Sequence, residues 1–391
     1  MDGPRACHPE EFDATMDLIN QTFRDGSDQD IRTDYPLIFN LDQLDYMRIV
    51  AVDGKVVSHV PLAPRTIIAR EDTCKIGIIS PTVTDPDYRH RGYATLCLRD
   101  CIRIATEKGW PLLVLWTLEA TFPFYHHSGF EAVGCQGWFY ELQPRDQALF
   151  ETGSFTIVQF DPSTSHHLDA IARIHDAEPY RIERSHSDYQ ALFTLPKTTT
   201  FLAEYGDQLT AYLTLGAGTN KPGLIEAGGT EAGLEALLKH ILSGRDQPIQ
   251  ALVLLTPSVL EKVIEASKPG AGRPIEEAAG IGFQMIRLNS LEKLLRSSVS
   301  LLREKSLGRR GDLTLNCSDV EESFTIHFRD GEVDFSNASG AAQVFLTRRQ
   351  WVQLIFGPHP SHPAPFVEGV AGELLKQVFP FYLPIWELDH S

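Results

Sequence analysis

The order of elements between residues 75 and 116 constrains the fold of this chain more than any other feature. Lys75–Ile79 and Thr82–Thr84 are apolar, β-rich runs that predict one strand interrupted at Ser80-Pro81. A helical stripe follows, made of Ala94, Leu98, Cys101, Ile102 and Ala105. Gly109 ends this helix, and Pro111–Trp116 predicts a short buried strand. A strand, a turn, a helix and a strand in this order predict a mixed α/β fold.

The turn between the first strand and the helix, Tyr88–Ala94, has the composition of an anion-binding turn. Gly92 lets the backbone approach a ligand closely because it has no Cβ. The free amides and the dipole at the start of a helix attract anions, and Arg89 and Arg91 would add charge-assisted hydrogen bonds. The alternative is an ordinary turn with surface arginines, since short glycine motifs often occur by chance.

A second motif, Phe124–Phe130, follows the predicted strand. Together, Arg89-x-x-Gly92-x-Ala94 and this "FY…GF" segment resemble the GNAT family of acetyl-CoA-dependent N-acetyltransferases. The resemblance implies that the amides of the turn hold the pyrophosphate of acetyl-CoA and that Tyr125 lies near the thioester sulfur. The cofactor-binding residues implied in this way are Thr82, Val83, Thr84, Arg89, His90, Arg91, Gly92, Tyr93 and Ala94.

The length of 391 residues indicates two or three domains. Residues 1–150 contain the two motifs. Residues 151–286 repeat the order of hairpin, strand, helix and strand, but Glu226–Thr230 stands where the arginine turn would be. We therefore expect a degenerate GNAT-like domain there that does not bind coenzyme A. Residues 287–391, with an expected amphipathic helix at Leu288–Leu302, four strands and two further helices, resemble a sterol-carrier-protein-2-like domain.

This three-part layout resembles the Eis (enhanced intracellular survival) family. The resemblance implies an α/β (α+β) fold class: tandem GNAT folds, each a mixed central sheet flanked by helices, followed by the sterol-carrier-like α+β domain. It also implies that the C-terminus reaches the active site, with Tyr125 as general acid and the terminal carboxylate of Ser391 as general base. Asp389 or a water would be next in line as the base. The aromatic segment 379–391 should be buried, and family members are often oligomeric, so a homo-oligomer is one alternative.

The formal net charge of −17 argues against a nucleic-acid partner, which would require concentrated Lys and Arg. Residues 1–50 hold eleven Asp or Glu and four Lys or Arg, a net of −7. Two interpretations of this acidity stay open: a solvated loop, or a wall that attracts a cationic amine substrate. In the second, Asp25 and Asp34 are the substrate-binding residues.

The six cysteines form no metal-binding or disulfide pattern, so we expect no metal and a reduced, cytoplasmic protein. Cys97 and Cys101 lie one helical turn apart and are best explained by packing. No apolar run is long enough to span a membrane, and residues 1–10 do not resemble a secretion signal. No membrane partner is therefore expected. The adjacent His126 and His127 are interpreted as structural.

Three functions compete. The first is transfer of an acetyl group from acetyl-CoA to a primary amine of an aminoglycoside-, polyamine- or lysine-like molecule, by direct attack of the amine. The second is binding of a lipid or other apolar ligand by the C-terminal domain, although its aromatic residues are more simply interpreted as core. They are Phe324, Phe328, Phe335, Phe345 and Trp351. The third is a scaffold, which would not need the arginine turn.

Overall fold

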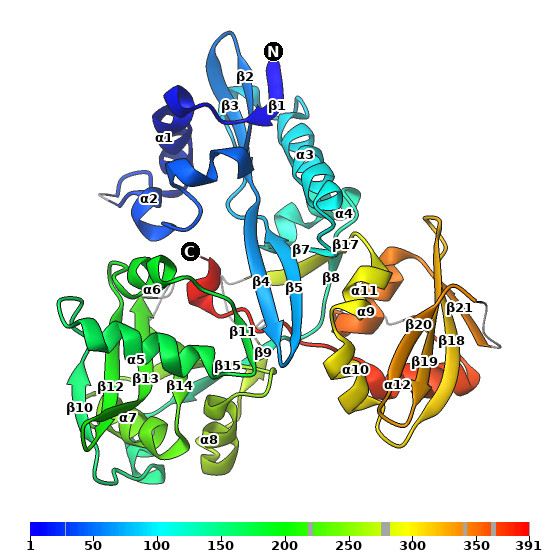
Figure 1. Ribbon diagram of the computed structural model, residues 1–391. Coiled ribbons are helices and arrows are strands. Elements are labelled where there is room, and N and C mark those ends of the chain that lie inside the picture. The colour runs from blue at the N-terminus through cyan, green and yellow to red at the C-terminus, as the bar shows by residue number, and fades with distance from the viewer. Residues whose placement is uncertain (28, 218–221, 275–281, 339–341, 361–364, 391) are drawn as a thin grey trace. The chain divides into compact units, whose positions relative to one another are not determined.

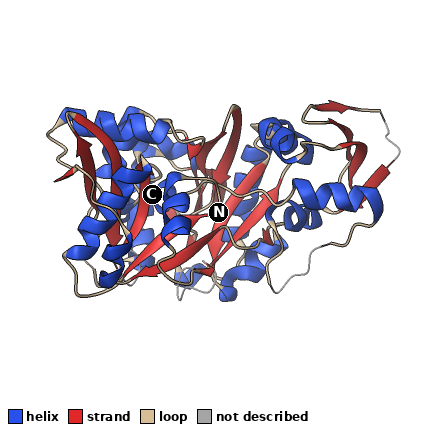
Figure 2. Cartoon of the chain, turned by 90° about the horizontal axis from the view of Figure 1, so that it is seen from below, coloured by secondary structure: helices blue, strands red, loops and turns tan. Residues whose placement is uncertain are grey.

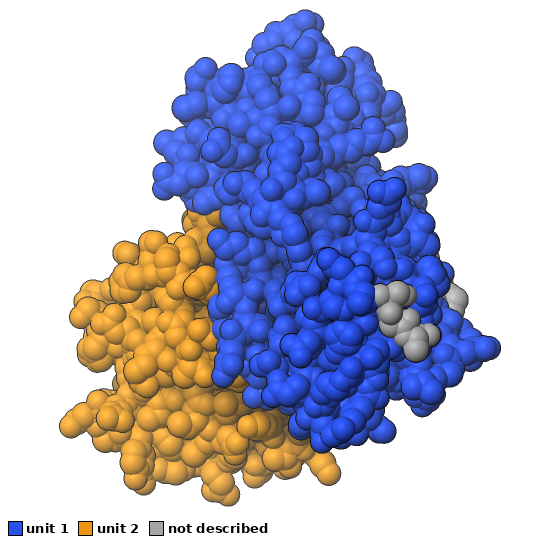
Figure 3. All heavy atoms as spheres, turned by 45° about the vertical axis from the view of Figure 1, so that its right-hand side comes forward, with its two compact units in different colours: residues 1–32, 38–134, 282–382 blue, residues 33–37, 135–281, 383–391 orange. Residues whose placement is uncertain are grey.

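The computed structural model describes residues 1–27, 29–217, 222–274, 282–338, 342–360 and 365–390. Both helices and strands are present, as Figure 2 shows, and the chain has a mixed α/β fold with several mixed sheets. The contacts divide the chain into two compact units made of interleaved segments (Figure 3). Unit 1 is residues 1–32, 38–134 and 282–382, and unit 2 is residues 33–37, 135–281 and 383–391. The proposed domain boundaries at residues 150 and 286 stay a prediction.

Unit 1 begins with the N-terminal part of the chain, labelled in Figure 1. Its elements up to residue 134 are β1 (Asp2–Ala6), α1 (Phe12–Phe23), β2 (Met47–Val52), β3 (Lys55–Pro61), β4 (Ala63–Ala69), β5 (Asp72–Ile78), β6 (Val83–Thr84), α3 (Tyr93–Glu107), β7 (Leu112–Thr117), α4 (Phe122–His127) and β8 (Glu131–Ala132). A short helix α2 (Ile31–Asp34) begins in unit 1 and ends in unit 2.

The strands of this part form two sheets in unit 1. One has the order β1-β2-β3-β6, and the other contains β4-β5-β7-β17-β8, where β17 (Phe283–Leu288) comes from much later in the chain. β17 pairs antiparallel with β7 along its whole length and with β8 at Met285 and Ile286. The helix α3 covers strands β2 and β3. A strand from residue 283 onward therefore completes a sheet that the N-terminal segment begins.

The helical stripe predicted between Ala94 and Ala105 is confirmed in part, since Ala94 and Ile102 are only half-buried. Leu98, Cys101 and Ala105 of α3 are fully buried, and so are Met16 and Ile19 of α1. Phe23, the last residue of α1, is 42% exposed.

The remaining part of unit 1 is a four-stranded sheet with helices. Its elements are α9 (Leu291–Arg296), α10 (Val299–Lys305), β18 (Arg310–Cys317), β19 (Glu322–Arg329), β20 (Val333–Ser336), β21 (Ala342–Leu346), α11 (Arg348–Phe356) and α12 (Gly369–Val378), with the strand order β20-β19-β18-β21. The single helix expected at Leu288–Leu302 is wrong. Leu288 ends β17, Ser290 caps α9 by accepting the amide of Lys293, and a break at Ser297 separates α9 from α10. Serine side chains compete with the helical hydrogen bonds in this way.

Unit 2 has a seven-stranded sheet of order β10-β12-β13-β14-β15-β9-β16. Its elements are β9 (Gly137–Leu142), β10 (Thr156–Gln159), α5 (Ser165–Asp176), β11 (Tyr180–Ile182), α6 (His186–Phe193), β12 (Thr199–Tyr205), β13 (Gln208–Ala217), β14 (Pro222–Gly229), α7 (Glu231–Ser243), β15 (Ile249–Leu254), α8 (Val259–Ser267) and β16 (Arg273–Pro274). The predicted hairpin, the helix at Glu231–Ser243 and the following strand are all present. Segment 383–390 belongs to this unit, and Trp386 and Leu388 pack into its cores.

Candidate active site

The predicted interrupted strand divides between two sheets. β5 pairs with β4 and β7 in one sheet, whereas β6 pairs with β3 in the other. Ser80 and Pro81 lie at the point where the two halves separate. Val83 is buried, and Thr84 bonds through its hydroxyl to Ser58 at 2.9 Å. The backbone between β5 and β6 thus leaves the sheet that contains β7, next to the turn that follows.

The turn enters α3 through Gly92, whose φ of 82° lies in the left-handed region. His90, with φ 61°, is left-handed as well. The first bond of the helix runs from the amide of Leu96 to the carbonyl of Gly92. The amides of Tyr93, Ala94 and Thr95 have no acceptor within the described part of the chain, as is general for the first turn of a helix. These donors make the turn a site for an anion.

The arginines of the turn are exposed and lightly tethered. Arg89 donates from Nε to the carbonyl of Thr84 at 3.3 Å, and Arg91 donates from Nη2 to the carbonyl of Asp87 at 3.0 Å. The guanidinium of Arg91 also lies 5.0 Å from the ring centroid of Tyr88. Because both arginines bond here to neutral carbonyls, their charges are available to a ligand.

The space around Gly92 is open. A Cβ built on Gly92 would meet no atom within 4 Å. At the corresponding place in unit 2, between β14 and α7, a Cβ on Gly229 would lie 2.3 Å from the carbonyl oxygen of Thr210, and one on Gly233 would lie 2.8 Å from the Cβ of Ala211. The first turn therefore has room for a ligand beside its backbone, whereas the second is filled by protein.

Tyr125 lies on α4 and is buried in the hydrophobic cluster that α3 also lines. Burial raises the pKa of its phenol, and the nearby hydroxyl of Thr82 opposes this shift. The two hydroxyls do not reach hydrogen-bond geometry, since Thr82 Oγ1 is buried without a partner in the described structure. Tyr125 therefore holds its proton at neutral pH. The structure brings together two of the residues that the motifs had singled out.

The two neighbouring histidines have structural contacts. His126 stacks on Phe122 and lies 3.4 Å from Glu131, and the ring of His127 bonds to the carbonyl of Pro123. The buried thiols of Cys97 and Cys101 face backbone carbonyls of β3. Burial raises the pKa of Cys97 to about 12. Within the described ranges, no three His, Cys, Asp or Glu side chains are placed to share a metal ion.

The two acidic candidates belong to different units. Asp25 is exposed after α1 in unit 1, whereas Asp34 is half-buried and belongs to unit 2. Asp28 lies outside the described residues. Asp30, which the acidic run also contains, pairs with Arg32, and this holds its pKa at about 2. The role of Asp25 and Asp34 in binding an amine substrate stays a prediction.

The C-terminal candidates have different outcomes. Ser391 lies outside the described residues, so its role as base stays a prediction. The aromatic segment before it is buried as expected, with Phe379, Phe381 and Trp386 all under a tenth exposed. Asp389 is engaged on both oxygens, by Arg184 and by the amide of Trp386. These bonds make Asp389 a poor substitute base, contrary to the expectation from sequence.

Sequence reasoning missed a buried ionic cluster in unit 2. Arg184 donates to Glu226 at 2.6 and 2.9 Å and to Asp389 at 2.7 and 3.0 Å. Tyr212 adds a hydroxyl bond to Glu226 at 2.8 Å. Burial alone would raise the pKa of Glu226, but Arg184 outweighs it and lowers that pKa. The absence of a basic residue near Glu226 in sequence hid this partner, which lies 42 residues away.

The acetyltransferase (GNAT) domain family matches residues 4–133. That range covers the split strand, the turn, α3, α4 and the Phe124–Phe130 motif. A search of curated proteins finds no match.

Solved structures share the fold over most of the chain. A GCN5-related N-acetyltransferase from Kribbella flavida has a TM-score of 0.67 at 17% identity, covering 97% of this chain and 96% of its own. One from Anabaena variabilis ATCC 29413 has a TM-score of 0.69 at 14% identity, with 96% and 95% covered. Eis1 from Mycobacterium abscessus has a TM-score of 0.59 at 12% identity, with 91% and 90% covered. At these identities the likeness concerns the fold. In the described part of the chain, every helix is too short or too polar to span a bilayer.

Proposed function

Since residues 4–133 match the GNAT domain and the protein is a GNAT N-acetyltransferase, we propose that it acetylates a primary amine of a small cationic molecule, with Tyr125 as general acid. Membership of this family implies acetyl-CoA and an acceptor substrate. The observation that carries the proposal is the turn that enters α3 at Gly92, which combines open space with two exposed arginines beside the hydrophobic cluster that buries Tyr125. Aminoglycosides, polyamines and lysine-like amines are the proposed substrate class.

The residues of the turn fit the cofactor. Free amides at the start of α3, open space beside Gly92 and two arginines without a carboxylate partner match a pyrophosphate. When bound, acetyl-CoA would supply the activated acetyl group. Thr82, Val83 and Thr84 would hold its pantetheine arm through their backbone, and Arg89 through Ala94 would hold its phosphates.

The proton transfers are assigned to two groups of this chain. Burial keeps the Tyr125 phenol protonated, so it can give its proton to the departing thiolate. A free alkylamine is scarce at neutral pH because its pKa lies near 10. A carboxylate beside the ammonium group would bind it and accept its proton, and we assign this role to the terminal carboxylate at Ser391. Substrate contacts by Asp25 and Asp34 are part of the same proposal.

One cofactor per chain follows from the contrast between the two turns. The place of the turn in unit 2 has no arginine, and its glycines pack against Thr210 and Ala211. We therefore propose that residues 151–286 are a degenerate GNAT-like domain and that the whole chain is Eis-like. Residues 287–391 would be the sterol-carrier-protein-2-like part. Phe324, Phe328 and Trp351 are buried there, as a domain core requires, while Phe345 is 63% exposed, so nothing favours lipid binding over acetyl transfer.

The experiment is a thiol-release assay with acetyl-CoA and a panel of polyamines, aminoglycosides and lysine peptides. Release with at least one amine supports the proposal, and no release with any amine contradicts it.

The base is tested separately. Adding one glycine after Ser391 moves the terminal carboxylate by about 3.5 Å and leaves Asp389 in its ion pair. We expect kcat to fall while the affinity for coenzyme A stays the same. Unchanged turnover would exclude the terminal carboxylate. Deletion of residues 389–391 is less informative, because it also removes the partner of Arg184.

A further inference from the structure

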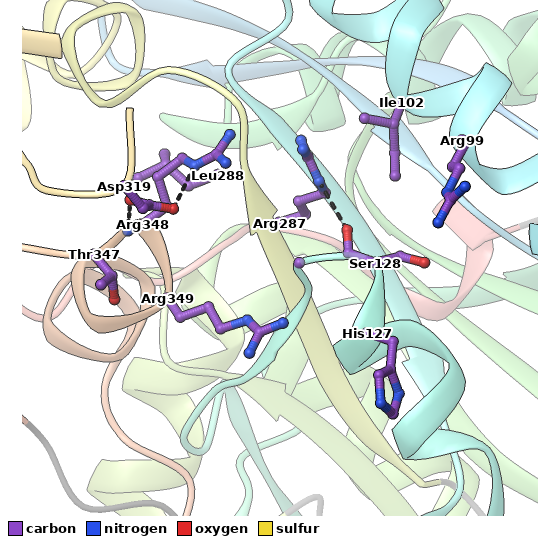
Figure 4. Close-up of a pocket in the computed structure, with 11 residues that line it drawn as sticks. Arg99, Ile102, His127, Ser128, Arg287, Leu288, Asp319, Thr347, Arg348 and Arg349 are labelled. Atoms are coloured by element: carbon purple, nitrogen blue, oxygen red, sulfur yellow. Dashed lines mark hydrogen bonds and ion pairs between the residues drawn. The ribbon is translucent and has the colours of Figure 1, made fainter. Parts of the chain in front are cut away.

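Unit 1 contains a cavity of about 520 Å³ that lies outside the proposed acetyl-CoA turn (Figure 4). Its walls come from the middle of α3, the end of α4, the end of β17, the loop after β18 and the start of α11. The lining residues are Arg99, Ile102, His127, Ser128, Gly129, Arg287, Leu288, Asp319, Thr347, Arg348 and Arg349. Its size lies in the range that holds small molecules.

The lining is strongly basic in a strongly acidic chain. Four arginines and one aspartate give the lining a net charge of +3, with His127 neutral, whereas the whole chain carries −17. The four arginines come from three elements. Arg99 is on α3, Arg287 is on β17, and Arg348 and Arg349 are on α11. Residues this far apart in sequence gather into one basic cavity only through the fold.

Most of this positive charge has no carboxylate partner. Arg348 pairs with Asp319 at 3.1 Å. Arg287 donates to the carbonyl of Ser128 at 3.1 Å and to the side chain of Asn289, which are both neutral acceptors. Figure 4 shows Arg349 extending from α11 toward α4, and Arg287 beside Ser128 with its guanidinium on the side of Ile102.

The other two arginines are similarly available. Arg349 donates to the carbonyl of His126. Arg99 is exposed on α3 and makes no hydrogen bond or ion pair with the described residues. Three of the four guanidinium groups therefore have a positive charge that is available to an anion. Each guanidinium is planar and carries five N–H donors.

Arg287 is half-buried beside other charged groups of the cavity. Partial burial, together with the nearby charge of Arg348 and against the charge of Asp319, lowers the pKa of Arg287 to about 10. A cation that is partly removed from water beside a like charge is destabilising unless an anion compensates it. No described carboxylate bonds to Arg287, so a bound anion would supply the missing compensation.

The cavity is separate from the turn that binds the cofactor phosphates in our proposal. None of its lining residues belongs to segment 82–94. Arg99 stands seven residues beyond Gly92 on α3, about 10 Å along a helix. Arg287, Arg348 and Arg349 lie outside residues 4–133, the part that matches the acetyltransferase family.

We propose that this cavity binds a small phosphorylated molecule at a second site, distinct from the acetyl-CoA site. A phosphate ester carries about two negative charges and three acceptor oxygens, and planar guanidinium groups bind it in a bidentate manner. Arg287 of β17 and Arg349 of α11 are its main ligands. Arg99 adds a third, exposed contact at the mouth.

The test measures binding of inorganic pyrophosphate by calorimetry to the full chain saturated with coenzyme A, which occupies the turn. We expect one pyrophosphate per chain. Arg287→Gln and Arg349→Gln should each raise the Kd about tenfold, in line with the worth of a charged hydrogen bond. Arg99→Gln, which breaks no internal contact, should raise it about threefold because its contact is exposed. Arg303→Gln, on α10 of the same unit and outside the lining, is the matched control and should leave the Kd unchanged.

The outcomes distinguish binding in this cavity from binding at the acetyl-CoA turn. Loss of pyrophosphate binding once coenzyme A is present would assign the anion to the cofactor's own site and overturn the proposal. Equal Kd values in the wild type, Arg349→Gln and Arg99→Gln would overturn it too. If Arg287→Gln fails to fold, Arg349→Gln and Arg99→Gln still decide.

Discussion

The side chains of Arg184 and Asp389 meet at 2.7 Å although 205 residues separate them in the chain. Both side chains are only 1% exposed, and Glu226 lies on the same guanidinium. This ion pair fixes the C-terminal segment to the core of unit 2. In our proposal it also fixes the point from which the last two residues, His390 and Ser391, extend to place the terminal carboxylate.

Arg184→Met should destabilise unit 2 because it leaves Glu226 and Asp389 buried without a cation. We expect a loss of about 3–5 kcal/mol, seen as faster hydrogen exchange in the peptide that contains residues 383–390. Arg173→Met, which removes an exposed arginine bonded only to the carbonyl of Leu209, is the control and should change exchange little. Unchanged protection in Arg184→Met would show that apolar packing alone holds the segment.

Gly92→Ala should weaken acetyl-CoA binding more than it weakens the fold. A left-handed alanine costs about 1–2 kcal/mol, and its Cβ would enter the open space assigned to the phosphates. We expect the KM for acetyl-CoA to rise about tenfold or more, the equivalent of one lost charged hydrogen bond. Gly54→Ala is the matched control, since Gly54 has φ 79° and equally open surroundings in a hairpin turn. Equal KM values in the two variants would refute the role of Gly92.

Tyr125→Phe should lower kcat by about 10²–10⁴-fold, the usual contribution of a general acid, while coenzyme A binding is retained. Tyr140→Phe, which removes a half-buried phenol in unit 2, serves as the control. A kcat within twofold of the wild type for Tyr125→Phe would point to another proton donor.

Thr82→Val should change the pH profile in a definite direction. The Thr82 hydroxyl lowers the pKa of Tyr125, against the larger effect of burial. Removing that hydroxyl therefore raises the Tyr125 pKa. Because the acid must be protonated, activity is lost as pH rises through its pKa, and the alkaline limb of kcat should move to higher pH. If the alkaline limb moves to lower pH or does not move, Tyr125 is not the group whose titration produces that limb.

The buried side chain of His59 should make the stability of unit 1 depend on pH. Burial lowers the pKa of His59 from 6.5 to about 3, and neither ring nitrogen has a hydrogen-bond partner in the described structure. Between these values the unfolded chain binds a proton that the folded chain does not, so stability falls as pH decreases from 6.5, by up to about 1.4 kcal/mol per unit. His59→Leu should reduce this slope in urea unfolding. His186→Leu, at an exposed position, is the control, and equal slopes would contradict the assignment.

The sequence predicted the local elements around the site well. The split at Ser80-Pro81 and the helix after Gly92 both follow from short-range patterns of apolar residues and glycine. The strand pairing of Phe283–Leu288 with β7 does not, because an apolar run carries no record of which distant strand it joins. The arginine cavity could not be predicted for the same reason. Arg99, Arg287 and Arg349 are far apart in the sequence, and only the fold places them around one cavity.

The chain ends were predicted only in part. The density of aromatic residues indicates that segment 379–391 is buried, since exposed tails are poor in such residues. The bonds of Asp389 could not be foreseen, because Arg184 has no distinguishing sequence context. Similarly, the break between α9 and α10 depends on Ser297 and Ser298, whose preference for ending a helix was weaker in the sequence than the apolar periodicity around them.

The position of β17 has a consequence for how the protein is made. During synthesis, β7 and β8 leave the ribosome about 150 residues before their common neighbour, at a rate of about 5–20 residues per second. For the intervening seconds, the acetyltransferase sheet has an unpaired edge where Phe283–Leu288 will lie. A nascent chain that has exposed only the first 133 residues thus holds the cofactor turn before it holds the complete sheet. The acetyltransferase sheet can therefore complete its folding only after residues 283–288 have been synthesised.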